Sequence, residues 1–262
     1  MFREDIPYEE IQQKYTQENW EIGFGLQAID GLKPSEYLVG LAEKQMLGKL
    51  TYEEVETNLK QYYEENPNAL PNLEADISSM RIAELLADSS FTFSPATLLG
   101  IHGKLFSEIE TFEFPVGEFR TTNITKKEPV LKGRTVAYTD YGMIKETLIW
   151  EFQQEKSKNY REKSLEEIAH EVMSFISAVW QVHPFREGNT RTIAVFAIKY
   201  LRTFGFKLNK KPFKNHSRFF RDALALANAD RLRQTDEYLR IFTENTLLGG
   251  NHKLVIGEAY QA

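Results

Sequence analysis

Apolar residues recur at helical spacing along most of the chain. The clearest case follows Ser164-Leu165-Glu166-Glu167, a capping box in which the serine hydroxyl and the second glutamate satisfy backbone N–H groups at a helix start. The apolar residues behind it recur every three or four positions, so this helix should bury one broad face. They are Ile168, Val172, Phe175, Ile176 and Val179.

Further helix starts are marked by capping residues upstream. Ser35 precedes an apolar pattern that stops at Gly48, Thr51 opens a second capping box, and Ser94 stands before a proline at the first helical position. A further helix is expected over about 73–87. The stretch 65–71 (ENPNALP) breaks the helical pattern. We therefore expect an N-terminal helical extension at 1–72 and a second domain at 73–262.

One segment predicts extended backbone instead. Residues 120–138 (RTTNITKKEPVLKGRTVAY) are rich in threonine and valine, and Lys132-Gly133 separates two extended runs. This pattern favours a β-hairpin. The predicted fold is therefore mainly α, with one hairpin.

Composition narrows the class of protein. The 262 residues are 42% hydrophobic and carry a formal net charge of −6, which disfavours disorder and gives no general attraction to nucleic acid. The absence of cysteine excludes disulfides and thiolate metal sites. The N-terminal residues lack the pattern of a signal peptide, and no apolar run approaches the ~20 residues that span a bilayer. A cytoplasmic protein without a membrane segment is the expectation.

Candidate chemistry concentrates in HPFREGNTR at 183–191, ahead of an amphipathic helix that should end near Gly205. Pro184 and Gly188 prevent the preceding helix from continuing, so 183–188 should form a tight loop between two helices. The N–H groups at the start of the next helix are a ready anion site, and phosphate is the usual anion. Arg191 could add a planar donor to the same anion.

Two more side chains in this run favour phosphoryl or nucleotidyl transfer. Glu187 would repel a phosphate unless a hard cation such as Mg²⁺ lay between them. His183 supplies a base with an unperturbed pKa of about 6.5. Each feature alone also has a structural explanation, because His183 could be a helix cap and Glu187 and Arg191 could form a surface ion pair. Their combination within so short a run favours the chemical interpretation.

The run 183–191 resembles the signature of the Fic (Fic/Doc, or Fido) family, whose pattern is H-x-F-x-[DE]-G-N-[GK]-R-x-x-R. The resemblance extends over roughly 77–229 and includes IHGKLF, the GEFRTTNITK segment and the helices around the motif. It implies an all-α Fic-type catalytic core with a β-hairpin flap. The helices upstream of this core also resemble the antitoxin-like segments of some relatives.

The resemblance implies a role for each matching residue. His183 would be the catalytic base that deprotonates a target hydroxyl, Phe185 would anchor the loop, and Glu187 would hold Mg²⁺. The flap would pair with an extended segment of the target protein by β-augmentation. The nucleotide phosphates would be bound by Gly188, Asn189, Thr190 and Arg191 in the motif and by Thr125 and Lys126 at the start of the flap.

The sequence departs from the family pattern at several positions. Thr190 replaces a glycine, which a helix N-terminus tolerates. Ala194 stands where the family has a second arginine that grips the outer phosphates. The family's inhibitory motif, [ST]-x-x-x-E-[GN], is matched only at Glu84, because Met80 and Leu85 occupy its flanking positions. Glu84 is therefore only a weak candidate for an inhibitory residue.

From this resemblance we expect a Mg²⁺-dependent adenylyltransferase that moves AMP from ATP to a hydroxyl of a target protein, which could be the chain itself. Two alternatives stay open: transfer of another phosphate-containing group, and a nucleotide- or target-binding regulator with little catalysis. The loss of the second arginine at Ala194 bears on both, because that side chain orients the nucleotide in the family, and it makes a regulator with little catalysis plausible. The expected partners are ATP and a target protein, with a homo-oligomer as an open case and with neither nucleic acid nor membrane.

Overall fold

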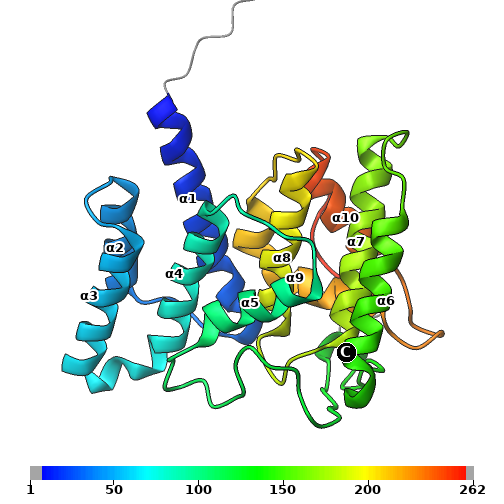
Figure 1. Ribbon diagram of the computed structural model, residues 1–262, viewed down its shortest axis with the longest axis horizontal. Coiled ribbons are helices and arrows are strands. Elements are labelled where there is room, and N and C mark those ends of the chain that lie inside the picture. Colours follow the sequence, from blue (N-terminus) through cyan, green and yellow to red (C-terminus); the bar gives the residue numbers. More distant parts are fainter. Residues whose placement is uncertain (1–7, 258–262) are drawn as a thin grey trace, which may run out of the picture.

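The computed structural model describes residues 8–257, with side chains from residue 15 onward, and this part of the chain is mainly helical (Figure 1). None of the described helices is long and apolar enough to cross a lipid bilayer. The α-helices are α1 (Tyr8–Gln27), α2 (Glu36–Met46), α3 (Tyr52–Glu65), α4 (Leu73–Ala87), α5 (Pro95–Phe106), α6 (Ile144–Ser157), α7 (Leu165–Val182), α8 (Asn189–Thr203), α9 (Lys211–Ala227) and α10 (Glu237–Leu247). Short 3₁₀ helices are η1 (Ala28–Asp30), η2 (Pro67–Asn72), η3 (Pro129–Leu131) and η4 (Tyr141–Met143).

The predicted capping residues begin the helices. Both capping boxes are complete: Ser164 and Thr51 each accept a hydrogen bond from the N3 backbone N–H, and the N3 glutamate accepts one in return. Ser35 and Ser94 cap α2 and α5 in the same way with their hydroxyls. The predicted break at 65–71 is occupied by η2. The starts of these four helices were therefore predictable from local capping chemistry.

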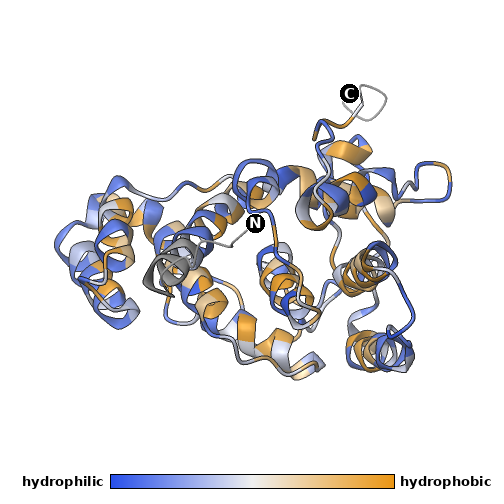
Figure 2. Ribbon diagram, turned by 90° about the horizontal axis from the view of Figure 1, so that it is seen from above, coloured by the Kyte–Doolittle hydropathy of each residue, from blue (hydrophilic) through white to orange (hydrophobic). Residues whose placement is uncertain are grey.

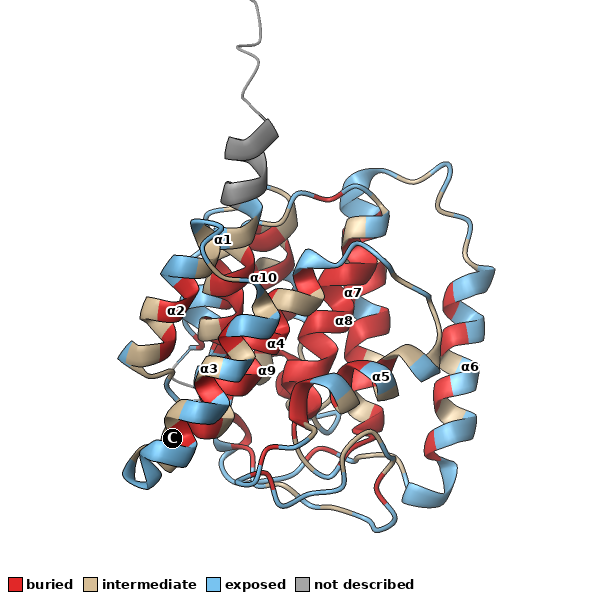
Figure 3. Ribbon diagram, turned by 60° about the vertical axis from the view of Figure 1, so that its left-hand side comes forward, coloured by how far each residue is buried: buried red, intermediate tan, exposed pale blue. Residues whose placement is uncertain are grey.

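Helix α8 forms the centre of the molecule. Every residue from Asn189 to Leu201 is buried, and α8 is accordingly red in the middle of Figure 3. Helices α5 and α7 pack against it, and α6 covers the outer side of α7 at one end of the molecule (Figures 1 and 2). The motif residues at the start of α8 therefore belong to a helix that is packed on all sides.

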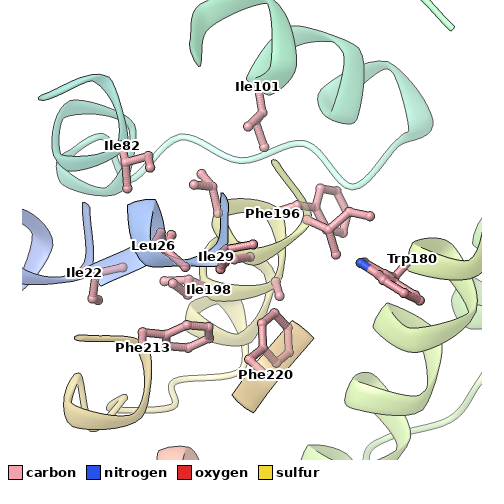
Figure 4. Packing of buried hydrophobic residues seen from close by; sticks show 14 of the residues in the cluster. Ile22, Leu26, Ile29, Ile82, Ile101, Trp180, Phe196, Ile198, Phe213 and Phe220 are labelled. Atoms are coloured by element: carbon pink, nitrogen blue, oxygen red, sulfur yellow. The ribbon is translucent and has the colours of Figure 1, made fainter. Parts of the chain in front are cut away.

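Helix α1 lies between α4 and α9. Its Ile22 and Leu26 enter the same cluster as Ile198 of α8 and Phe213 of α9 (Figure 4). A methyl group added at Gly23 would lie 2.5 Å from the carbonyl oxygen of Ser79, so α1 and α4 pack with their backbones close together. One buried apolar cluster thus includes residues on both sides of position 72, and the boundary between an extension (1–72) and a catalytic domain (73–262) stays a prediction.

The predicted β-hairpin is wrong. The described residues contain no strand, and 120–138 forms a single antiparallel bridge between Glu128 and Arg134. Pro129 cannot donate a ladder hydrogen bond, and the left-handed pair Lys132-Gly133 turns the chain back at once, so that the Gly133 N–H donates to the Glu128 carbonyl at 3.0 Å. Valine and threonine content suggested strands, but Val130 and Val136 are used as buried anchors instead.

Candidate functional site

The motif loop between α7 and α8 is tied to itself and to the core. The side chain of Asn189 accepts a hydrogen bond from the Phe185 N–H at 2.9 Å and donates to the Phe185 carbonyl at 2.8 Å. Phe185 is fully buried and stacks on the His102 ring at 3.9 Å. Gly188 ends the loop in the left-handed conformation, with φ +74°. The loop is therefore held in one shape before any ligand binds.

Two residues outside the motif fix this loop, and the sequence analysis assigned neither a role. The His102 ring hydrogen-bonds the carbonyl of Glu187 at 3.1 Å and accepts from the Gly117 N–H at 2.9 Å. Burial lowers the pKa of His102 to about 4, so this ring is neutral. Arg120 donates from Nε to the carbonyl of His183 at 2.9 Å. Their only sequence signal was that both lie in segments that extend the family resemblance beyond the motif.

His183 lies at the end of α7 in the left-handed conformation, with φ +50°. Its Nδ1 is 3.3 Å from the carbonyl of Trp180, which can only accept, so Nδ1 carries the proton and Nε2 has a free lone pair. Nε2 is buried and has no hydrogen-bond partner among the described residues. Burial and the Lys126 charge hold the pKa of His183 well below its usual value of 6.5. The arrangement gives a neutral imidazole with an unused basic nitrogen.

The carboxylate of Glu187 is held by Lys126. The Lys126 ammonium donates to both carboxylate oxygens, at 3.0 and 2.9 Å. The structure thus joins the residue predicted to bind metal to a residue predicted to bind nucleotide. Within residues 15–257 there is no cluster of three or more side chains that could hold a metal ion. A cation at Glu187 would therefore take its remaining ligands from the substrate or from water.

Arg191 is buried and is engaged by the N-terminal helices. Its Nη2 donates to Glu74 at 2.6 Å and its Nη1 to the amide oxygen of Gln27 at 3.1 Å. Nε lies 2.8 Å from a carboxylate oxygen of Asp30, a charge contact without hydrogen-bond alignment. The guanidinium also covers the Phe106 ring, 4.7 Å from its centroid. A phosphate at Arg191 would have to compete with two carboxylates.

The other predicted residues have varied surroundings. The Thr190 hydroxyl accepts a hydrogen bond from the Trp180 indole at 2.9 Å, and Thr125 is exposed beside Lys126. Ala194 is fully buried in the core. Glu84 pairs with Lys104 at 2.9 Å, so the carboxylate of α4 that reaches Arg191 is Glu74 rather than Glu84.

A cavity of about 500 Å³ lies beside Lys126, Glu187 and Arg191. The motif contributes Glu187 and Arg191 to its wall, and α9 contributes two arginines that the sequence analysis did not single out, Arg218 and Arg221. The charged lining residues are the basic Lys126, Lys127, Arg191, Arg218 and Arg221 and the acidic Asp30, Glu74 and Glu187. Such a cavity suits a polyanion with several phosphate groups.

Comparison with known proteins gives one family match and several similar folds. Residues 92–201 match the model of the Fic/DOC family. No curated protein sequence matches the chain. Among solved structures, the N-terminal Fic domain of a cell filamentation protein from Bartonella quintana is 23% identical with a TM-score of 0.51, covering 70% of this chain and 84% of that one.

Two further Bartonella structures have the same fold. The N-terminal Fic domain of Bep8 from Bartonella sp. 1-1C has a TM-score of 0.52 at 19% identity, covering 68% of this chain and 84% of that domain. BepC from Bartonella tribocorum, solved with bound AMPPNP, has a TM-score of 0.51 at 20% identity, covering 69% and 87%. The Fic/DOC family model thus covers the motif together with α5 to α8, and the three solved structures share the fold of the chain.

Proposed function

We propose that this chain is a protein adenylyltransferase that moves AMP from ATP to a hydroxyl of a target protein. Members of the Fic family commonly transfer AMP, and BepC, which has the same fold, was solved with the ATP analogue AMPPNP. The observation that carries the proposal is the unpartnered, neutral Nε2 of His183 at one end of a loop whose other end lines a basic cavity. A base beside a polyphosphate site is what such a transfer requires.

The proposed reaction is an in-line displacement at the α-phosphorus. Nε2 of His183 takes the proton of the target hydroxyl while the hydroxyl oxygen bonds to the α-phosphorus. The bond from that phosphorus to the bridging oxygen breaks, and pyrophosphate leaves. Because Ala194 is buried and does not line the cavity, the outer phosphates would meet Arg218 and Arg221 of α9.

The donor set at Glu187 fits a magnesium ion that arrives with the nucleotide. Mg²⁺ is commonly bound through one or two carboxylates together with substrate phosphates, and one carboxylate is what this site offers. When bound, the ion would neutralise phosphate charge beside Glu187. The Lys126 ammonium, which donates to both carboxylate oxygens of Glu187, would then donate to a phosphate oxygen instead.

Glu187→Gln is expected to remove the advantage that Mg²⁺ gives to ATP binding. An amide keeps the shape of the carboxylate but has no charge with which to bridge a cation to phosphate. Calorimetric titration with ATP, in Mg²⁺ and in a chelator, should give affinities that differ in the wild type and nearly coincide in the variant. Glu118→Gln, which changes an exposed carboxylate in the segment between α5 and η3, is the control. Equal ATP affinities of the wild type in Mg²⁺ and in a chelator would mean that Glu187 does not bind a metal ion.

Glu74→Gln is expected to tighten ATP binding by about tenfold, the effect of one charge-assisted hydrogen bond of roughly 1.4 kcal/mol. The substitution frees Arg191 from its shortest carboxylate contact, so a phosphate competes for it more easily. Glu84→Gln is a matched control on the same helix, because Glu84 pairs with Lys104 and not with the site. It should change affinity and transfer by less than about threefold. Equal effects of the two variants would contradict the proposed competition at Arg191.

The proposed function is tested by the position of the transferred phosphate. The full chain is incubated with ATP labelled at the α- or the γ-phosphate, and protein-bound label is measured. AMP transfer predicts label from the α-position only. Label from the γ-position would indicate transfer of another phosphate group. ATP binding with no covalent label on the protein from either position would indicate a nucleotide-binding regulator.

A further inference from the structure

The catalytic nitrogen proposed above is covered. The ring of Tyr138 lies over His183, with centroids 4.1 Å apart and planes inclined by 33°. Trp180 meets the same imidazole edge-on at 5.3 Å. His183 is only 3% exposed. A target hydroxyl cannot approach to hydrogen-bond distance of Nε2 while the base is enclosed in this way.

Tyr138 is held in place by a buried carboxylate. Its hydroxyl donates to Oε1 of Glu128 at 3.0 Å, and burial together with the Glu128 charge raises the pKa of this hydroxyl, so it stays a donor. Glu128 is fully buried. Burying a charged carboxylate is costly unless it is paired and hydrogen-bonded, and here Arg221 donates from Nη2 to Oε2 at 3.0 Å. The cover over His183 therefore depends on an ion pair.

The other face of Arg221 belongs to the basic cavity. Arg221 lines it together with Lys126 and Arg191, and its side chain is one-quarter exposed. Guanidinium groups bind phosphate at least as readily as carboxylate, through paired N–H donors. A polyphosphate in the cavity and Glu128 therefore compete for the same cation.

We propose that a polyphosphate entering this cavity draws Arg221 away from Glu128 and thereby uncovers His183. Without Arg221, Glu128 is an uncompensated buried charge, and the segment that carries Glu128 and Tyr138 moves toward solvent. Glu128, Tyr138 and Arg221 are thus positioning residues that act on the base through its cover. The inference rests on the proposed role of His183, and it adds an order of events in which the nucleotide binds before the target hydroxyl can reach the base.

The test measures access to His183 without any transfer reaction. The full chain is treated with diethyl pyrocarbonate, and modification of each histidine is followed by peptide mass mapping. His252, whose side chain is 46% exposed, is the internal standard. Inorganic tripolyphosphate is the probe, because it has phosphates but no AMP to donate. The ligand-free protein should label His183 at least about tenfold more slowly than His252, as expected for a site reached only by local opening.

Tripolyphosphate should raise the His183 rate by about fivefold or more, and leave His252 unchanged. In Glu128→Gln, His183 should be labelled slowly with or without tripolyphosphate, because a neutral amide can remain buried after Arg221 leaves. Tyr138→Phe, which removes only the hydroxyl, should speed labelling before the probe is added. If the pair of Glu128 and Arg221 were merely structural, its substitution would alter the labelling rate of ligand-free His183, and tripolyphosphate would have no effect on that rate.

Two results would overturn the inference: a His183 rate that tripolyphosphate leaves unchanged or lowers, or a Glu128→Gln variant that responds like the wild type. The inference can fail separately from the proposed function. AMP transfer without a labelling response refutes the cover mechanism alone. A labelling response without AMP transfer supports the cover mechanism and refutes the proposed enzyme.

Discussion

His183→Asn is expected to lower AMP transfer by about 10²–10⁴-fold, the usual cost of losing a general base. Asparagine is the suitable replacement because it tolerates the left-handed backbone of position 183 better than alanine does. Its amide has no basic nitrogen, so the proton of the target hydroxyl has no acceptor. The measurement is the rate of AMP incorporation, with circular dichroism and ATP affinity as controls that should remain near wild type.

The pH profile checks the same assignment. Because burial and Lys126 keep the pKa of His183 well below 6.5, the base is already unprotonated throughout the neutral range. The acid limb of kcat/KM, which reports the free enzyme, should therefore lie well below pH 6.5. Undiminished transfer by a correctly folded His183→Asn protein would remove His183 from the mechanism.

Gly188→Ala is expected to destabilise the protein by about 2–4 kcal/mol, from the combined cost of a left-handed alanine and a steric clash. The φ angle of Gly188 is +74°, and a Cβ there would lie 2.4 Å from Cε2 of Phe106. Phe106 is buried and supports the Arg191 guanidinium, so displacing its ring also disturbs the phosphate site. Denaturant unfolding and ATP titration measure the two effects.

Gly205→Ala provides a matched control for this substitution. Gly205 also has a left-handed backbone, with φ +82°, but a Cβ there would meet no atom within 4 Å. The free energy of unfolding of Gly205→Ala should fall only by the cost of a left-handed alanine, about 1–2 kcal/mol, and its affinity for ATP should not change. Equal losses from the two variants would mean that the contact with Phe106 has no energetic role.

The parts of the fold that could be predicted are those determined by local chemistry. Ser164 and Thr51 begin helices because their hydroxyls accept backbone N–H groups three residues on, which is a relation within one turn. The 120–138 segment could not be predicted in this way. Its valines are buried in the common core, with η3 packed against α9, and packing of that kind overrides the strand propensity that suggested a hairpin.

The candidate site shows the same division. The motif at 183–191 indicated a base, a carboxylate and a phosphate-binding arginine because these residues are close in the sequence. Glu74, which holds Arg191, and Tyr138, which covers His183, are far from them in the sequence and carry no motif of their own. Only the packing of α4 and of the 120–138 segment against the motif loop brings them together. The resting, covered state of the site was therefore not predictable from the sequence.

The central claim is that the chain transfers AMP, and the intact mass of the protein tests it most directly. The full chain is incubated with ATP and Mg²⁺, alone and with candidate target proteins, beside the His183→Asn variant. The account predicts a mass increase of one adenylyl group on the chain or on a target, absent with His183→Asn. An increase of one phosphoryl group, or no change on any protein although ATP is bound, would contradict it.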